Sequence, residues 1–109
     1  MRLSEYQELA RRTQNTDLDS VAKEMHALYG MASEVGEIHG IYQKMFQGHD
    51  GSRIKAIKEL GDLLWFIAEY ADSLEISLDE VAQCNIDKLR KRYPDGFDAD
   101  RSVHREEYK

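Results

Sequence analysis

The stretch IKELGDLLWFIAEYADSL, residues 57–74, indicates the fold class of this chain. Its apolar residues cover more than half of the circumference of the helix that it predicts: Ile57, Leu60, Leu63, Leu64, Trp65, Ile67, Ala68, Ala71 and Leu74. A helix in a lone four-helix bundle needs only one buried stripe. The surplus therefore indicates burial against a second copy, and we expect an all-α protein that assembles as a homodimer or homotetramer.

The rest of the chain predicts three more helices in one domain that covers all 109 residues. The four expected helices span residues 4–13, 18–46, 52–73 and 77–92, with the breaker QGHDG at 47–51 between the second and the third. Two capping boxes are expected, one of Ser4 with Gln7 and one of Ser77 with Glu80. The segment 94–109 begins at the only proline and is polar and turn-rich, which predicts an irregular tail.

The composition excludes several classes of protein. With 15 basic and 21 acidic residues the net charge is −6, and no basic stripe is present for a long nucleic acid. The single cysteine, Cys84, excludes an internal disulfide and is expected to fill the core rather than act as a nucleophile. The start of the chain has no apolar run that predicts a signal peptide or a membrane span. We therefore expect a cytoplasmic protein of a bacterial cell or a phage-infected host cell.

Pairs of acids interrupt two of the apolar helices. They read ExxE and ExxD, each with a glycine between the acids: Glu34 and Glu37 around Gly36, and Glu59 and Asp62 around Gly61. Removing unpaired carboxylates from water costs several kcal/mol each. A divalent cation offsets this cost, and Mg²⁺ prefers such hard oxygen ligands, with Mn²⁺ as a second option. The two glycines, each of which weakens a helix by about 1 kcal/mol, are expected to let the two backbones approach closely.

Two other interpretations of the acids are open. Lys55 precedes Glu59 by four residues and Lys58 precedes Asp62 by four, so the second pair could belong to a salt-bridged, solvated face. A di-iron site of the ferritin type uses Glu-x-x-His pairs, which these acids do not form. Together the two clusters favour a magnesium site.

The last predicted helix carries a polar and cationic stripe of Asn85, Lys88 and Arg92. Lysine and arginine bind phosphate groups, and asparagine offers an amide to a sugar or phosphate. The alternative is a basic helix end that only complements the helix macrodipole.

These motifs together resemble a known family. ExxE at 34–37, ExxD at 59–62, NIDKL at 85–89 and RYPDGF at 92–97 are similar to the MazG-like nucleoside triphosphate pyrophosphohydrolases of the all-α NTP pyrophosphatase superfamily. The resemblance implies a MazG fold like a four-helix bundle and Mg²⁺-dependent hydrolysis of a nucleoside triphosphate to the monophosphate and pyrophosphate. It also implies that all four acids ligate the metal and act in catalysis.

The resemblance also implies a set of substrate-binding residues: Asn85, Lys88, Arg92, Tyr93, Lys44 and His26. For Lys44 the alternative is a solvated lysine, and for His26 a buried structural histidine. Some relatives carry a glutamate directly before the first ExxE acid, where this chain has Ser33. Serine cannot act as a general base, so either a water activated by the metal or Glu37 is expected to serve.

The base and sugar of the substrate are not indicated by these motifs, and Trp65, Phe46 and Tyr93 are the aromatic candidates for stacking. The functional alternative to an enzyme is a non-catalytic helical module that binds a nucleotide or a partner protein.

Overall fold

The computed structural model describes residues 1–104, and all regular structure there is helical. The helices are α1 (Leu3–Arg11), α2 (Ser20–Met45), α3 (Arg53–Ser73), α4 (Leu78–Arg92) and α5 (Ala99–Val103). The expected all-α class is confirmed. The prediction of an irregular tail is wrong at α5, where the Asp98 side chain caps the helix by accepting from the Arg101 backbone N–H. The remainder of that prediction, residues 105–109, lies outside the described residues.

Side-chain caps explain where the longer helices begin. Asp19 caps α2 and Ser52 caps α3, each accepting from a backbone N–H three residues ahead. Ser77 and Glu80 form the predicted capping box at the start of α4.

The predicted box of Ser4 with Gln7 is wrong. Helix α1 follows Arg2, which makes no side-chain cap. The Gln7 side chain instead joins α1 to the rest of the fold: its amide nitrogen donates to the Ile76 carbonyl (3.0 Å), and its carbonyl oxygen accepts from the Leu78 N–H (2.8 Å).

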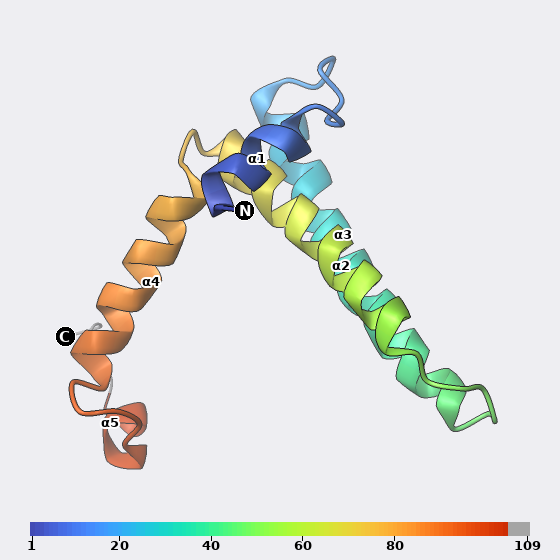
Figure 1. Cartoon of the computed structure of the whole chain (residues 1–109). Helices are drawn as coiled ribbons and strands as arrows, with labels where there is room; N and C mark the ends of the chain where they lie inside the picture. Colours follow the sequence, from blue (N-terminus) through green and yellow to red (C-terminus); the bar gives the residue numbers. More distant parts are fainter. Residues whose placement is uncertain (105–109) are drawn as a thin grey trace.

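The chain has the shape of an open V (Figure 1). Helices α2 and α3 lie antiparallel and form one arm, α4 forms the other, and α1 crosses the apex where the arms meet. The radius of gyration is 17.2 Å. A compact domain of this length has a radius of gyration of about 13 Å. The single chain is therefore unusually open.

Small side chains make up most of the core, which lies at the apex. Ala10, Ala68, Ala71 and Leu78 form the buried cluster, with Tyr6, Trp65, Ile67 and Ile76 packed against it. Along the hairpin, Gly30 is buried against Phe66, and a Cβ at Gly30 would overlap the Phe66 ring. The close approach of α2 and α3 therefore depends on Gly30.

Gly36 and Gly61 do not have the expected role within one chain. A Cβ at either position would meet no atom of the described chain within 4 Å. The prediction that these glycines bring the α2 and α3 backbones together is wrong.

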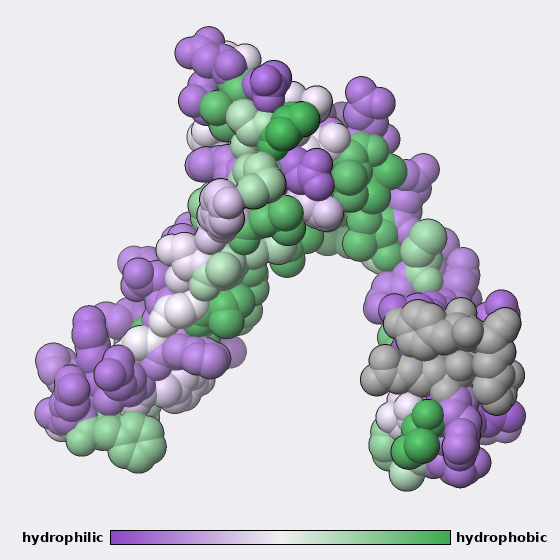
Figure 2. All heavy atoms as spheres, turned by 180° about the vertical axis from the view of Figure 1, so that it is seen from behind, coloured by the Kyte–Doolittle hydropathy of each residue, from purple (hydrophilic) through white to green (hydrophobic). Residues whose placement is uncertain are grey.

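Large apolar side chains remain exposed on both arms. Figure 2 shows hydrophobic surface near the apex and along the side of the hairpin that faces the gap between the arms. The exposed residues include Ile57, Leu60, Val81 and Ile86, each at least 40% accessible. Cys84 is also exposed on α4, so the expectation that it fills the core is wrong for the single chain. No helix of the described residues has the length and apolar character needed to cross a membrane.

Asp72 on α3 is the polar centre of the apex. Its carboxylate accepts hydrogen bonds from Gln7 (2.8 Å), Arg11 (2.7 Å) and Gln14 (2.7 Å), and its side chain is only 7% exposed. Burial works to raise the pKa of Asp72, but the hydrogen bonds from these three side chains outweigh it, and the pKa lies below its ordinary value of 3.8. The ionised carboxylate therefore stabilises the fold.

We expect Asp72→Ala to lower the free energy of unfolding at pH 7 by about 2 to 4 kcal/mol, because the buried Gln7 and Gln14 and the exposed Arg11 lose a charged partner. A group with a depressed pKa stabilises the fold above its unfolded pKa and loses that contribution as the pH falls through its folded pKa. The difference between variant and wild type should therefore shrink below about pH 4. Urea unfolding at pH 7 and pH 3 measures this difference in the free energy of unfolding. Asp17→Ala, in an exposed loop, is the control, and an equal loss in both variants would contradict this role for Asp72.

Candidate metal centre

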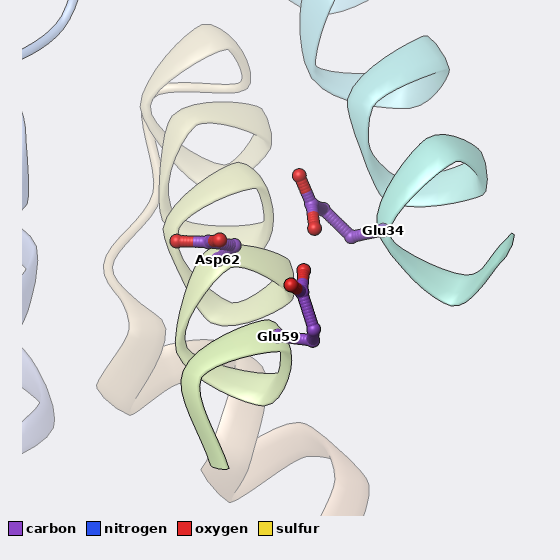
Figure 3. Close-up of side chains that lie close together, drawn as sticks. All are labelled: Glu34, Glu59 and Asp62. Atoms are coloured by element: carbon purple, nitrogen blue, oxygen red, sulfur yellow. The ribbon is translucent and has the colours of Figure 1, made fainter. Parts of the chain in front are cut away.

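The α2–α3 hairpin brings three of the four predicted acids together. One carboxylate oxygen from each of Glu34, Glu59 and Asp62 lies within 4.8 Å of the other two. Glu34 comes from α2 and reaches across to the other two on α3, as Figure 3 shows. Glu34 and Glu59 are partly buried, while Asp62 is exposed on the open side of the group. We call these three residues the acidic triad.

The electrostatics of the acidic triad are unfavourable without a cation. A hydrogen bond to the Glu59 carboxyl is the largest cause that raises the pKa of Glu34, which reaches about 7. Desolvation and the negative charges of Asp62, Glu59 and Glu37 act in the same direction. The second oxygen of Glu34, Oε2, is buried and has no hydrogen-bond partner among the described residues. The groups around Glu34 therefore bring the pKa of its carboxyl close to neutral pH.

The geometry of the triad fits a divalent cation. Octahedral Mg²⁺ with ligand distances of about 2.0–2.1 Å separates its ligand oxygens by about 3–4 Å. The spacing within 4.8 Å therefore needs only small side-chain movements to ligate an ion, and the orphan oxygen of Glu34 supplies a further ligand atom. All donors are hard oxygens, which suits Mg²⁺ or Mn²⁺ better than softer metals.

The fourth predicted ligand, Glu37, lies outside the triad. It lines a cleft of about 260 Å³ on the hairpin together with Gly40, Ile41, Lys44, His49, Asp50, Lys55, Lys58 and Glu59. Its charge still contributes to the raised pKa of Glu34, so it is close to the triad without belonging to it. Lys44, a predicted phosphate contact, lines the same cleft. Glu59 belongs to both the triad and the cleft, so the two are adjacent.

An aromatic surface borders the triad on its other side. Thr13, Trp65 and Phe66 line a shallow pocket of about 320 Å³ together with Glu34 and Asp62. The Trp65 indole N–H donates to the Thr13 hydroxyl (2.8 Å), and the Trp65 and Phe66 rings meet edge to face at 5.1 Å. The predicted stacking candidate Trp65 therefore lies beside the carboxylates.

His26 lies near this aromatic surface and has a partner that the sequence analysis missed. Its Nδ1 lies 2.6 Å from Oε1 of Glu69, which is fully buried. The His26 ring also contacts the rings of Trp65 (6.4 Å) and Phe66 (5.6 Å). The sequence does contain an indication of this partner. Glu69 is the lone acid in the apolar run LLWFIAEYA, residues 63–71, and a buried acid requires a polar partner. His26 is half exposed rather than buried.

The predicted substrate residues on α4 are not near the triad in one chain. Asn85 and Lys88 line a mostly apolar pocket on α4, and α4 runs along the other arm (Figure 1). Arg92 and Tyr93 lie at the far end of that helix, where the Arg92 guanidinium sits 5.7 Å from the centre of the Tyr93 ring. Phe46, another stacking candidate, is 94% exposed just after the end of α2. In the single chain these α4 side chains therefore lie apart from the carboxylates.

Comparison with known proteins identifies the family of the chain. The profile of the MazG nucleotide pyrophosphohydrolase domain matches residues 26–97, which include the triad and its aromatic border from α2 and α3. The Gene 37 protein of Mycobacterium phage L5 is 33% identical over 81 residues, covering 70% of this chain and 71% of the phage protein. No solved structure gives a significant match. The chain therefore belongs to the MazG nucleotide pyrophosphohydrolase domain family.

Proposed function

We propose that this protein hydrolyses nucleoside or deoxynucleoside triphosphates to the monophosphate and pyrophosphate, with Mg²⁺ or Mn²⁺ held by Glu34, Glu59 and Asp62 and supported by Glu37. The observation that carries the proposal is the meeting of three carboxylates across the hairpin, one with its pKa raised to about 7. The family to which the chain belongs supports the reaction class. When bound, the cation offsets the charge of the phosphates and polarises the phosphorus centre that is attacked.

The reaction needs a base as well as a cation. Water adds to phosphorus, the anhydride P–O bond to the leaving pyrophosphate breaks, and the proton of the water passes to a base. Ser33 is exposed and cannot accept that proton at neutral pH. Glu37 borders the triad and lines the adjoining cleft, so we assign this role to Glu37.

The nucleoside has a binding surface on the side of the triad opposite to the cleft. Trp65, Phe66 and the half-exposed ring of His26 offer aromatic faces next to Glu34 and Asp62. A nucleobase that stacks there would place its phosphates at the triad. Stacking is tolerant of the base, so the selectivity of the enzyme depends on edge contacts.

We further propose that the enzyme is a homodimer, alone or within a tetramer, in which α4 of one copy approaches the hairpin of the other. The exposed apolar residues on both arms support this arrangement, because a stable monomer seldom leaves so much apolar surface open. Lys88 and Asn85 would then act on substrate held at the partner's triad. The relative in a mycobacterial phage supports a setting in the cytoplasm of a bacterial or phage-infected cell, where the reaction would clear or balance nucleotide pools.

Substitution of the triad tests the activity. We expect Glu59→Gln and Asp62→Asn each to lower kcat/KM with Mg²⁺ and a triphosphate by at least about 100-fold, since each removes a charged metal ligand. Glu5→Gln, on the exposed face of α1, is the control and should leave activity unchanged. Pyrophosphate release from the eight common triphosphates measures the rates. An active double variant would refute the catalytic role of the triad. Nucleotide-dependent stabilisation with no release from the wild type would refute the enzyme and favour a binding module.

Metal binding should depend on pH. The pKa of Glu34 in the folded protein is about 7, above its ordinary value of 4.5. The protonated carboxyl therefore contributes its full stability to the metal-free fold below about pH 4.5, and this contribution is lost as the pH rises through 7. We expect the metal-free melting temperature to fall between pH 5 and pH 8. Mg²⁺ should raise it at pH 8 and have little effect at pH 5, because protons compete for Glu34. In Glu34→Gln both dependences should vanish, and a wild type indifferent to Mg²⁺ at pH 8 would contradict the site.

From the chain mass of 12.7 kDa, we expect a solution mass of about 25 kDa for the homodimer, or about twice that for the tetramer. Mixing separately inactive Lys88→Ala and Glu59→Gln chains gives a sharper test. If each site uses acids from one copy and Lys88 from the other, random exchange should restore about one quarter of wild-type activity, because half of the dimers hold one intact site. No recovery after demonstrated subunit exchange would show that Lys88 does not act across the interface.

A further inference from the structure

A cleft lined by both lysines and acids runs beside the acidic triad toward the tip of the hairpin. Three lysines and a histidine line it: Lys44 and His49 from the end of α2 and the following loop, and Lys55 and Lys58 from the first two turns of α3. The acids in the same cleft are Glu37 and Glu59, next to the triad, and Asp50 in the loop. We call this feature the lysine cleft.

The lysines of the cleft are not used to neutralise the acids. The i, i+4 spacing of Lys55 with Glu59 and of Lys58 with Asp62 would allow two ion pairs. Among residues 1–104 the structure forms neither pair within 4.0 Å, and Lys44 makes no ion pair there either. The interpretation of the ExxD segment as a salt-bridged face is therefore wrong, and the lysine charges are available to a ligand.

The start of α3 adds to the positive potential. Acids usually occupy the first turn of a helix, where they complement the macrodipole. The first turn of α3 has none and carries Arg53 and Lys55 instead. Positive side chains at the positive end of a helix repel it, unless an anion lies between them. This arrangement is consistent with an anionic ligand in the cleft.

We propose that the lysine cleft holds the terminal phosphates of the substrate, and that Lys55 and Lys58 make the enzyme select triphosphates over diphosphates. This inference rests on the proposed function and extends it. The reacting phosphorus lies at the triad, and the two phosphates beyond it extend along the hairpin toward the tip, away from the aromatic surface. A diphosphate leaves the far end of the cleft empty and forfeits the contacts with α3.

The direct probe is inorganic pyrophosphate, which carries the same two phosphates without a nucleoside. In titration calorimetry with Mg²⁺, we expect the double variant Lys55→Ala/Lys58→Ala to bind pyrophosphate at least about tenfold more weakly than the wild type, since two charge-assisted contacts are lost. Binding of a nucleoside monophosphate should be unchanged. Lys91→Ala, an exposed lysine on α4, is the matched control and should bind both ligands normally.

Kinetics provide the second readout. The double variant should raise KM for a triphosphate more than it lowers kcat, and its preference for a triphosphate over the matching diphosphate should fall by about tenfold. Lys58→Arg should retain most of the preference, because the charge is kept. Circular dichroism melting checks that the variants are folded, and Lys55→Gln/Lys58→Gln repeats the test with a longer polar side chain.

The results separate this inference from the proposed function. Lysine-dependent binding of pyrophosphate by a protein that hydrolyses no triphosphate would refute the enzyme and support the cleft. Equal pyrophosphate affinity in wild type and double variant would overturn the cleft, whatever the activity. Absence of pyrophosphate binding by the wild type with Mg²⁺ would overturn it as well.

Discussion

The meeting of the Glu34, Glu59 and Asp62 carboxylates across the α2–α3 hairpin is the constraint on which the site depends. Because these acids lie so close together, the pKa of Glu34 is raised to about 7, and Glu34 keeps its proton more readily than an ordinary glutamate. The fold holds these groups together because Gly30 lets Phe66 pack against α2, which fixes the spacing of the two helices. On the proposed function, a divalent cation would offset the same negative charge and take the place of the Glu34 proton at neutral pH.

The buried core lies at the apex, and the candidate site lies on the hairpin arm. The hydrogen bonds to Asp72 and a core of small side chains join α1, α3 and the start of α4 at the apex. The triad and the lysine cleft lie on the hairpin arm, outside that core. The arms themselves expose large apolar residues such as Ile57 and Val81, which the proposed homodimer would cover. Binding and assembly can therefore change without disturbing the apex.

The sequence could predict features with a local cause and not those with a distant one. The four long helices and the box of Ser77 with Glu80 follow from periodicity and caps within a few residues. Gln7 fits a capping box equally well in sequence, but it bonds to Asp72 and Leu78, more than 60 residues away. The acids of the triad could be predicted because carboxylates in apolar helices require partners. The glycine that matters, Gly30, could not be told from Gly36 and Gly61, because only the packing of Phe66 separates them.

On the proposed function, the separation of charges on α3 would let an acidic protein bind a polyanion. The net charge of −6 repels a nucleotide as a whole, so attraction has to be local. Ion pairs of Lys55 with Glu59 and of Lys58 with Asp62 would cancel both the cation site and the anion site, and the structure forms neither. Glu37 and Glu59 lie next to the triad and three lysines line the same cleft, so on the proposed function a cation and a phosphate chain would each meet opposite charge. The complex of a divalent ion with a polyphosphate matches this pattern, whereas either component alone would leave half of it uncompensated.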